Sequence, residues 1–222
     1  MFTCRNLYLI YDEKKSDPTY ALKDINLELS GNKLIGIMGP SGSGKSSLLY
    51  ALASLKDITS GSITYNGQPI SSMGAGERAL MRKEDFGFIF QRHFLIEYLT
   101  VLQNVLTPVN SVSIDLVNRA MELLEKLSIG HLVNKKPAEL SVGQRQRVAI
   151  ARALISKPKV IFGDEITASL DHTSAKEVMA VLNEYKKEHL VIIVTHDPTI
   201  LVGAEEIVHI WDGTISKIEK KG

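Results

Sequence analysis

Several features that would assign a protein to a broad class are missing from this sequence of 222 residues. The chain has a single cysteine, Cys4, which excludes an internal disulfide framework and suits a reducing compartment. Its 26 lysines and arginines nearly balance 25 aspartates and glutamates, so a formal net charge of +1 gives nucleic acid no general electrostatic attraction. The sequence therefore predicts that any charged ligand is bound at a local site, and that nucleic acid is not a partner.

Long apolar runs are missing as well. No run approaches the ~18 to 20 apolar residues that a membrane-spanning helix needs, and the longest runs, such as residues 190–194, have the length of a strand. The first residues lack the charged region, long apolar region and cleavage site of a signal peptide. We therefore expect a cytoplasmic protein that does not itself span a membrane.

What the sequence does contain is a succession of short strands and helices. Alternating apolar residues near turn-forming residues predict small antiparallel strands at residues 4–11, 21–29 and 62–65. Nearly continuous apolar runs predict strands buried on both faces of a mainly parallel sheet at residues 34–38, 86–90, 160–162 and 190–194. Helical spacing predicts helices at residues 48–55, 115–127 and 141–155, with Gly130 as the stop of the second one. Asp212 and Gly213 predict a hairpin turn between residues 207–211 and 214–218.

The clearest motif follows the apolar run at residues 34–38. It matches the phosphate-binding pattern G-x-x-x-x-G-K-[ST] between a predicted strand and a predicted helix, at Gly39, Pro40, Ser41, Gly42, Ser43, Gly44, Lys45, Ser46 and Ser47. Glycines let backbone N–H groups converge on phosphate oxygens, Lys45 adds a charge for the β and γ phosphates, and the Ser46 hydroxyl can bind Mg²⁺. A glycine- and serine-rich turn matches the pattern by chance in roughly one chain in a hundred of this length. The loop alone predicts nucleotide binding, and it suits a kinase, a GTPase or a motor equally.

Two adjacent carboxylates, Asp164 and Glu165, follow the apolar run at residues 160–162. Ligands bind at the carboxyl ends of the strands of an α/β sheet, so we expect Asp164 to hold Mg²⁺, directly or through water. Glu165 is then free to polarise the attacking water as a general base. A solvated acidic turn is the competing interpretation, and the phosphate loop weighs against it.

Residues 140–154, with the sequence LSVGQRQRVAIARAL, resemble the ABC signature and the helix that follows it. The resemblance to ABC transporter ATP-binding cassettes extends over essentially the whole chain. It implies that Ser141, Gly143 and Gln144 reach across a dimer interface to the nucleotide of the opposite subunit. A helix N-terminus suits a γ-phosphate because of its free N–H groups and positive dipole end. Ser141 and Gln144 also match a helix-capping box, a structural role that is compatible with the functional one.

Three further residues take their roles from this resemblance. Gln91 matches the Q-loop glutamine, which contacts Mg²⁺ and the attacking water beside the surface that receives the membrane subunit. His196 matches the switch histidine that contacts the γ-phosphate, and Asp171 matches the D-loop aspartate that links the two subunits. A lone glutamine or histidine after a strand is more often an ordinary loop residue, so each match is weak alone and gains weight from the order and spacing of the set.

Tyr11 occupies the place of the family's adenine-stacking aromatic residue, at the end of a short predicted strand. An aromatic face can stack on adenine without reading its edge. Structural packing is the competing role, because Tyr8 and Tyr20 lie close in sequence.

The sequence departs from the commonest family pattern at three positions. Val142 replaces the first glycine of Ser-Gly-Gly-Gln, and a β-branched residue tolerates a positive φ poorly, which predicts a restricted backbone there. Ile166 replaces the proline after the Asp-Glu pair, and Ser47 replaces a threonine. None of these changes removes a catalytic group, so we expect the same reaction, whereas the sequence leaves open whether Val142 and Ile166 slow it.

We therefore predict a single α/β domain over residues 1–222. The resemblance implies a P-loop NTPase core with a mainly parallel sheet and a small N-terminal antiparallel β subdomain, roughly at residues 1–90 and 157–222. A helical signature subdomain is inserted, roughly at residues 91–156. The implied ligands are ATP and Mg²⁺. The implied partners are a second copy or a related cassette in an ATP-dependent dimer, and a separate membrane-spanning permease that holds the protein on the inner face of the cell membrane.

Within the family, residues 87–91 and 99–105 resemble the MacB and LolD group. This implies export or extraction of a peptide, bacteriocin, lipoprotein or antimicrobial compound, whereas an FtsE-like regulatory ATPase of cell division or cell-wall remodelling would share every motif. A soluble ATPase of translation or DNA maintenance is disfavoured, because the sequence has neither a second cassette nor a long coiled-coil insertion. Residues 93–105 could form an apolar groove for a permease helix or belong to the core of the helical subdomain.

Overall fold

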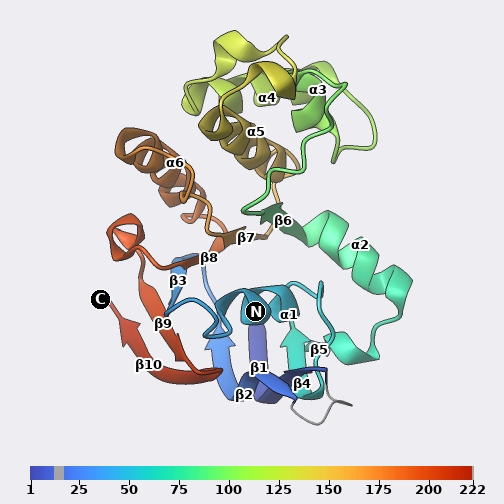
Figure 1. Cartoon of the computed structure of the whole chain (residues 1–222). Helices are drawn as coiled ribbons and strands as arrows, with labels where there is room; N and C mark the ends of the chain where they lie inside the picture. Colours follow the sequence, from blue (N-terminus) through green and yellow to red (C-terminus); the bar gives the residue numbers. More distant parts are fainter. Residues whose placement is uncertain (13–17, 222) are drawn as a thin grey trace.

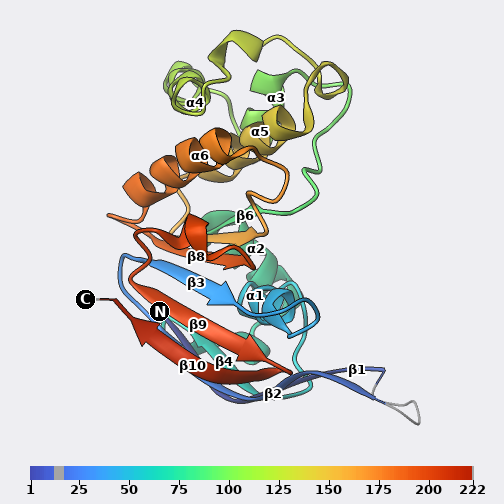
Figure 2. The same ribbon diagram turned by 60° about the vertical axis from the view of Figure 1, so that its left-hand side comes forward.

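A six-stranded sheet forms the centre of the computed structural model, which describes residues 1–12 and 18–221 (Figures 1 and 2). The strand order is β10-β9-β3-β8-β7-β6. The strands are β3 (Leu34–Met38), β6 (Phe86–Ile89), β7 (Val160–Asp164), β8 (Leu190–Thr195), β9 (Glu206–Trp211) and β10 (Thr214–Lys220). All neighbours pair in parallel except the edge strand β10, which is antiparallel to β9. The prediction of a mainly parallel sheet is confirmed.

The central strands are apolar throughout because each face of the sheet is covered. In β8, Leu190, Ile192 and Val194 enter one hydrophobic core, and the alternate residues Val191 and Ile193 enter a second core on the opposite face. All five side chains are fully buried. A strand that is buried on both faces has no polar side, which explains the continuous apolar runs of the sequence.

A smaller antiparallel sheet covers one of these faces. Its order is β2-β1-β4-β5, formed by β1 (Phe2–Tyr11), β2 (Thr19–Leu29), β4 (Ser60–Tyr65) and β5 (Gln68–Pro69). Helix α1 (Lys45–Leu52) runs between the two sheets (Figure 1). Its Leu48 and Leu52 share a core with Leu7 and Leu9 of β1 and Ile35 of β3. The phosphate loop at the start of α1 is therefore anchored from both sides.

The remaining helices lie away from the antiparallel sheet, except for α2, which leads into β6 (Figure 1). They are α2 (Ala75–Asp85), α3 (Val101–Leu106), α4 (Ile114–Lys126), α5 (Val142–Leu154) and α6 (His172–Tyr185), with short 3-10 turns η1 (Ile70–Ser72), η2 (Gly130–Leu132), η3 (Pro137–Glu139) and η4 (Pro198–Leu201). Helices α3, α4 and α5 pack on one another at the top of Figure 1. The boundaries of a helical subdomain at residues 91–156 stay a prediction.

Two helices, α4 and α1, have boundaries that differ from the sequence-based predictions, and α1 ends at Leu52 rather than at residue 55. Helix α4 ends at Lys126, and its stop is Ser128, which has a left-handed φ of 58°, rather than the predicted Gly130. The N–H groups of Ser128 and Ile129 bond back to the carbonyls of Glu125 and Leu124, which is the Schellman pattern of helix ends. Gly130 instead begins η2. Helix α1 begins at Lys45, three residues before the predicted start, because Gly44 is its N-cap residue.

The predicted hairpin is confirmed. Asp212 and Gly213 have φ of 46° and 76° and connect Trp211 to its partner Thr214. Two left-handed residues in a row are typical of the two-residue turns that match the twist of antiparallel strands. The turn lies against the phosphate loop, since the Gly213 N–H donates to the Ser43 carbonyl at 3.0 Å.

The only cysteine is expected to report on unfolding. Cys4 is fully buried in β1, and burial raises the pKa of its thiol to about 12. Since the thiolate is the reactive form, the folded protein should react with an aromatic disulfide reagent at pH 8 at least about 100-fold more slowly than the protein in denaturant. Equal rates in the two conditions would show that β1 is open to solvent.

Candidate functional site

The phosphate loop connects β3 to α1 at the carboxyl edge of the central sheet. It turns sharply, with the Ser43 N–H donating to the Pro40 carbonyl at 3.2 Å. Gly44 has φ of 103°, and a Cβ added there would lie 2.3 Å from the Ala21 carbonyl oxygen, so only glycine fits. A Cβ added to Gly42 would meet no atom within 4 Å, and the buried Ser43 hydroxyl has no hydrogen-bond partner in the described part of the chain. The loop thus combines an open concave side with an unpaired polar group, as a phosphate cradle requires.

Lys45 lies across this loop. Its side chain is buried, and Nζ donates a hydrogen bond to the Pro40 carbonyl at 2.7 Å. The ammonium group is therefore held within the loop by a neutral acceptor. A phosphate oxygen in the loop would offer it a stronger, charged acceptor.

Asp164, at the end of β7, is bonded to two hydroxyl groups of α1. The Ser46 hydroxyl donates to Oδ1 at 2.9 Å, and the Tyr50 hydroxyl donates to Oδ2 at 2.6 Å. Burial, followed by the hydrogen bond to Asp164, raises the pKa of Tyr50 above its ordinary value, so this hydroxyl is a donor at neutral pH. Sequence motifs had not singled out Tyr50, although its four-residue spacing from Ser46 places both on one face of α1.

The donor set at this point suits magnesium. Among residues 1–12 and 18–221, no group of three histidine, cysteine, aspartate or glutamate side chains could enclose a metal ion. Magnesium needs no such cage, because it is usually bound by one or two carboxylates together with substrate phosphates and water. The Ser46 hydroxyl and the Asp164 carboxylate, beside the phosphate loop, provide hard oxygen atoms of this kind.

The structure brings Glu165 and His196 together. Both carboxylate oxygens of Glu165 lie 3.0 Å from Nδ1 of His196, and the imidazole is 69% exposed. Glu165 has a left-handed φ of 49°, and its N–H donates to the Val194 carbonyl at 3.0 Å. A non-glycine residue in this conformation stores strain, and such residues gather at functional sites. The carboxylate points to the exposed imidazole at the sheet edge, where a water molecule could be activated.

Gln91 lies at the same edge. Ile89 of β6 pairs with Gly163 of β7, so Gln91 and Glu165 each follow that pair by two residues. Gln91 is exposed. The predicted glutamine, carboxylate and histidine therefore extend from three neighbouring parallel strands, at one end of the sheet.

Tyr11 lies beside the phosphate loop. Its hydroxyl is 3.3 Å from Oγ of Ser47, and Nζ of Lys56 lies 4.7 Å from the centre of its ring. The ring is half-buried. This contact with the loop favours Tyr11 over Tyr8 and Tyr20 as the aromatic residue that could stack on a base.

The signature residues lie at the N-terminus of α5. The predicted capping box is confirmed, with Gln144 N–H donating to Ser141 Oγ at 3.2 Å and Ser141 N–H donating to Gln144 Oε1 at 2.9 Å. The prediction of a restricted backbone at Val142 is wrong, because Val142 is the first helical residue and has no positive φ. A Cβ on Gly143 would approach the Leu170 side chain to 3.2 Å. Asp171, next in the chain, caps α6 by accepting from the Ser174 N–H at 3.0 Å.

These residues do not meet the phosphate loop of their own chain. Helix α5 belongs to the helical group above the central sheet, and the loop at the start of α1 lies below it (Figures 1 and 2). One chain therefore contains the phosphate loop and the signature residues, the two parts of the predicted ATP site, at separate places.

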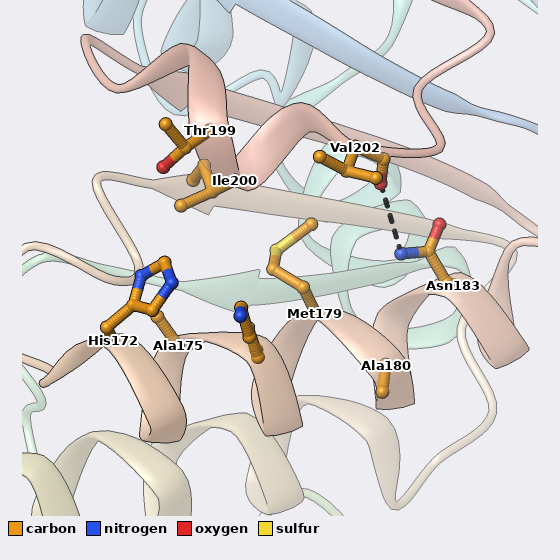
Figure 3. Close-up of a pocket in the computed structure, with 9 residues that line it drawn as sticks. His172, Ala175, Met179, Ala180, Asn183, Thr199, Ile200 and Val202 are labelled. Atoms are coloured by element: carbon orange, nitrogen blue, oxygen red, sulfur yellow. Dashed lines mark hydrogen bonds between the residues drawn. The ribbon is translucent and has the colours of Figure 1, made fainter.

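A separate cavity of about 330 Å³ lies between α6 and η4 (Figure 3). Ala175, Met179, Ile200 and Val202 give it a mainly apolar lining, and Asn183 Nδ2 donates to the Val202 carbonyl at its rim. No predicted site residue lines it. Its apolar walls do not suit a nucleotide triphosphate.

Comparison with known proteins decides the family. Residues 22–168 match the family described as ABC transporter. The chain belongs to the ABC transporter family. It is an ATP-binding cassette of the kind that hydrolyses ATP.

Two relatives illustrate the range of the family. The ABC cassette is 43% identical over 225 residues to an uncharacterized ABC transporter ATP-binding protein of Methanocaldococcus jannaschii, with all of both chains covered. It is also 45% identical over 198 residues to the macrolide export ATP-binding/permease protein MacB of Salmonella choleraesuis. That match covers 87% of the cassette but only 31% of MacB.

Two solved structures share the fold. Both are of the ABC transporter cassette MJ0796, one described as dimeric and the other as dimeric in a post-hydrolysis state bound to ADP and Pi. Each matches the cassette with a TM-score of 0.93 and 34% identity over the full length of both chains. They confirm the predicted P-loop NTPase fold and support a dimer.

Proposed function

We propose that this cassette is the ATP-hydrolysing subunit of a membrane transporter and acts on a separate permease. The observation that carries the proposal is the convergence of the phosphate loop, Asp164, and the Glu165–His196 pair at one edge of the sheet. No helix in residues 1–12 and 18–221 is long and apolar enough to cross a bilayer. We propose that a separate permease provides the membrane path and holds the cassette on the inner face of the membrane.

The positions of the side chains support the following hydrolysis reaction. Backbone N–H groups of the loop and Lys45 bind the β and γ phosphates, and Tyr11 stacks on the adenine. Ser46 and Asp164 would hold Mg²⁺, and Gln91 would contact it. When bound, this ion would neutralise phosphate charge. Glu165 accepts a proton from the attacking water, and His196 holds that carboxylate and contacts the γ-phosphate.

A second cassette completes the site. Ser141, Gly143 and Gln144 present the N-terminus of α5, which has free N–H groups suited to a γ-phosphate. Since they lie apart from the loop of the same chain, we propose that they bind ATP held by a second copy or a related cassette. Leu170 and Asp171 lie beside this N-terminus, where they would join the interface. ATP closes the dimer, and loss of the γ-phosphate opens it.

The segment at residues 93–105 divides into two parts. Val101 and Val105 are fully buried in the core, whereas Phe94 and Tyr98 are 63% and 75% exposed. Phe94 meets Phe90 edge to face, and Phe90 lines a groove whose other residues include the apolar Phe88 and Pro108 and the charged Arg82, Lys83 and Arg152. We propose that the exposed part, with this groove, receives an amphipathic helix of the permease.

A reconstituted complex tests the proposal. The cassette would be co-expressed with a candidate permease, and ATP hydrolysis measured in proteoliposomes with and without it. We expect Tyr98→Ser to reduce the stimulation by the permease at least about 10-fold, as for a buried aromatic anchor, without changing the basal rate. Val202→Ser is a matched control, because Val202 is 74% exposed at the end of η4. Equal stimulation of Tyr98→Ser and wild type would contradict this docking surface.

The substrate class is proposed from similarity to MacB. A macrolide, a lipoprotein, a bacteriocin and a short peptide would each be added to the same proteoliposomes. Export or extraction predicts that one of them raises the rate of ATP hydrolysis. An FtsE-like regulatory role predicts a rate that none of them changes.

A further inference from the structure

Tyr50 touches the candidate metal site although it belongs to none of the motifs. It lies in α1, one helical turn after Ser46, and its hydroxyl donates to Asp164 Oδ2 at 2.6 Å. The bond joins α1 to the end of β7. Asp164 is only 5% exposed, so its carboxylate has little access to water that could replace this donor.

The two hydroxyl groups fix the plane of the Asp164 carboxylate. Ser46 holds Oδ1 and Tyr50 holds Oδ2. Each oxygen of an ionised carboxylate can accept two hydrogen bonds, so one acceptor position on each oxygen stays available for a metal ion or its water. Partners of this kind orient a metal ligand without touching the metal.

The ring of Tyr50 continues this contact toward the surface. It packs on Phe90, with ring centres 6.4 Å apart and planes at 51°. Phe90 in turn meets Phe94 edge to face at 5.4 Å and 88°. Phe94 is 63% exposed, and Phe90 immediately precedes Gln91. Three aromatic rings thus connect the surface to the carboxylate.

Arg152 of helix α5 holds the backbone at Phe94, the outermost of these three aromatic residues. Its guanidinium donates to the carbonyls of His93 and Phe94 at 2.7 and 2.6 Å. Phe94 also has a left-handed φ of 46°, which a bulky residue adopts only when its surroundings hold it. A displacement of Phe94 would therefore reach Phe90 and Tyr50 through direct contacts.

We propose that Tyr50 is a positioning residue that holds the Asp164 carboxylate for Mg²⁺ and links it, through Phe90, to the exposed Phe94 at the permease surface. This inference rests on the proposed function, because it takes Asp164 as the magnesium carboxylate and the surface around Phe94 as the docking site. The phenol of Tyr50 would therefore affect the affinity for Mg²⁺ and would not itself contact the nucleotide.

The test is the magnesium dependence of ATP binding, measured by calorimetry with the full chain. Tyr50→Phe keeps the ring and removes the hydroxyl. We expect it to bind ATP without Mg²⁺ as the wild type does, within about twofold, because the phenol does not touch the phosphate loop. The Mg²⁺ concentration that gives half of the increase in ATP affinity should rise about 10-fold or more.

Tyr65 offers a matched control. Its hydroxyl donates to Asp85 Oδ2 at 2.9 Å, and its ring packs on Phe2 and Phe86, remote from the phosphate loop. Tyr65→Phe should lose a similar hydrogen bond without any change in magnesium dependence. Phe90→Leu keeps the Tyr50 hydroxyl and removes the ring on which Tyr50 packs. It should shift the magnesium dependence in the same direction as Tyr50→Phe, by a smaller factor. This variant tests the inference if Tyr50→Phe fails to fold.

The role of Tyr50 and the role of Asp164 can be tested separately. Wild-type magnesium dependence in Tyr50→Phe, or an equal shift in Tyr65→Phe, would overturn the role of Tyr50 and leave the proposed function intact. A wild-type cassette whose ATP affinity does not respond to Mg²⁺ would overturn the assignment of Asp164 itself.

Discussion

Replacement of Glu165 by glutamine is expected to lower the rate of ATP hydrolysis about 100-fold or more while ATP binding is retained. The glutamine keeps the shape of the side chain and can still meet Nδ1 of His196, but it cannot accept a proton from water. A positioned general base typically contributes 10²- to 10⁴-fold to a rate, so about 100-fold is the lower limit of the loss. Phosphate release at saturating ATP and Mg²⁺ measures the rate, and calorimetry measures the binding.

A second buried carboxylate controls for the loss of charge. Glu206, at the start of β9, is 4% exposed and pairs with Lys33 at 2.6 Å. It lies at the opposite end of the sheet from Glu165, since β9 is parallel to β7 through β3 and β8. Glu206→Gln should reduce stability without lowering the rate of hydrolysis in the folded protein. A Glu165→Gln protein that keeps more than a tenth of the wild-type rate would show that another group acts as the base.

The second large effect is expected at Gly44. Alanine there must adopt φ near 103°, and its Cβ would lie 2.3 Å from the Ala21 carbonyl oxygen. The left-handed backbone alone costs about 1–3 kcal/mol, and the contact with a backbone oxygen adds to this cost because neither partner can rotate away. The loop must move away from β2, so we expect the free energy of unfolding to fall and ATP affinity to drop at least about 10-fold. Urea unfolding and ATP titration measure the two effects.

Gly42 separates backbone strain from close contact. It also has a left-handed φ, 78°, but a Cβ added there meets nothing within 4 Å. Gly42→Ala should therefore lower the free energy of unfolding only by the cost of the left-handed backbone. If the two alanine variants are equally stable, the packing of the phosphate loop against Ala21 is not as described.

The fold was predictable where one physical rule decided the local structure. Burial on both faces produces the continuous apolar run of β8, and the requirement for two left-handed residues explains Asp212 and Gly213. The capping box of Ser141 and Gln144 likewise depends on a three-residue spacing within one helix. Such rules are local, so the sequence alone suffices to apply them.

Prediction failed where the deciding contact lay elsewhere in the chain. Ser128 ends α4 in a left-handed conformation that serine seldom adopts, while the nearby Gly130 was the more obvious stop. The role proposed for Tyr50 depends on its hydrogen bond to Asp164, which lies 114 positions later in the chain. The position of Val142 as the first residue of a helix removes the restriction that its side chain alone suggests.

In the candidate site, too, the sequence predicts what depends on local spacing and not what depends on distant contacts. The phosphate loop and the Asp164–Glu165 pair are recognisable from residue types and spacing, because their chemistry requires glycines, a cation and carboxylates in fixed order. Whether Ser141 acts on a nucleotide depends on a second chain, and neither the sequence nor one cassette contains that contact.

In the proposed dimer, two cassettes enclose ATP between the phosphate loop of one and the α5 N-terminus of the other. Light scattering of purified Glu165→Gln with ATP, first without and then with Mg²⁺, tests it most directly, with ADP as the control nucleotide. We expect the mass of two chains with ATP and of one chain with ADP. The mass of a single chain under every condition, with ATP shown to be bound, would contradict it.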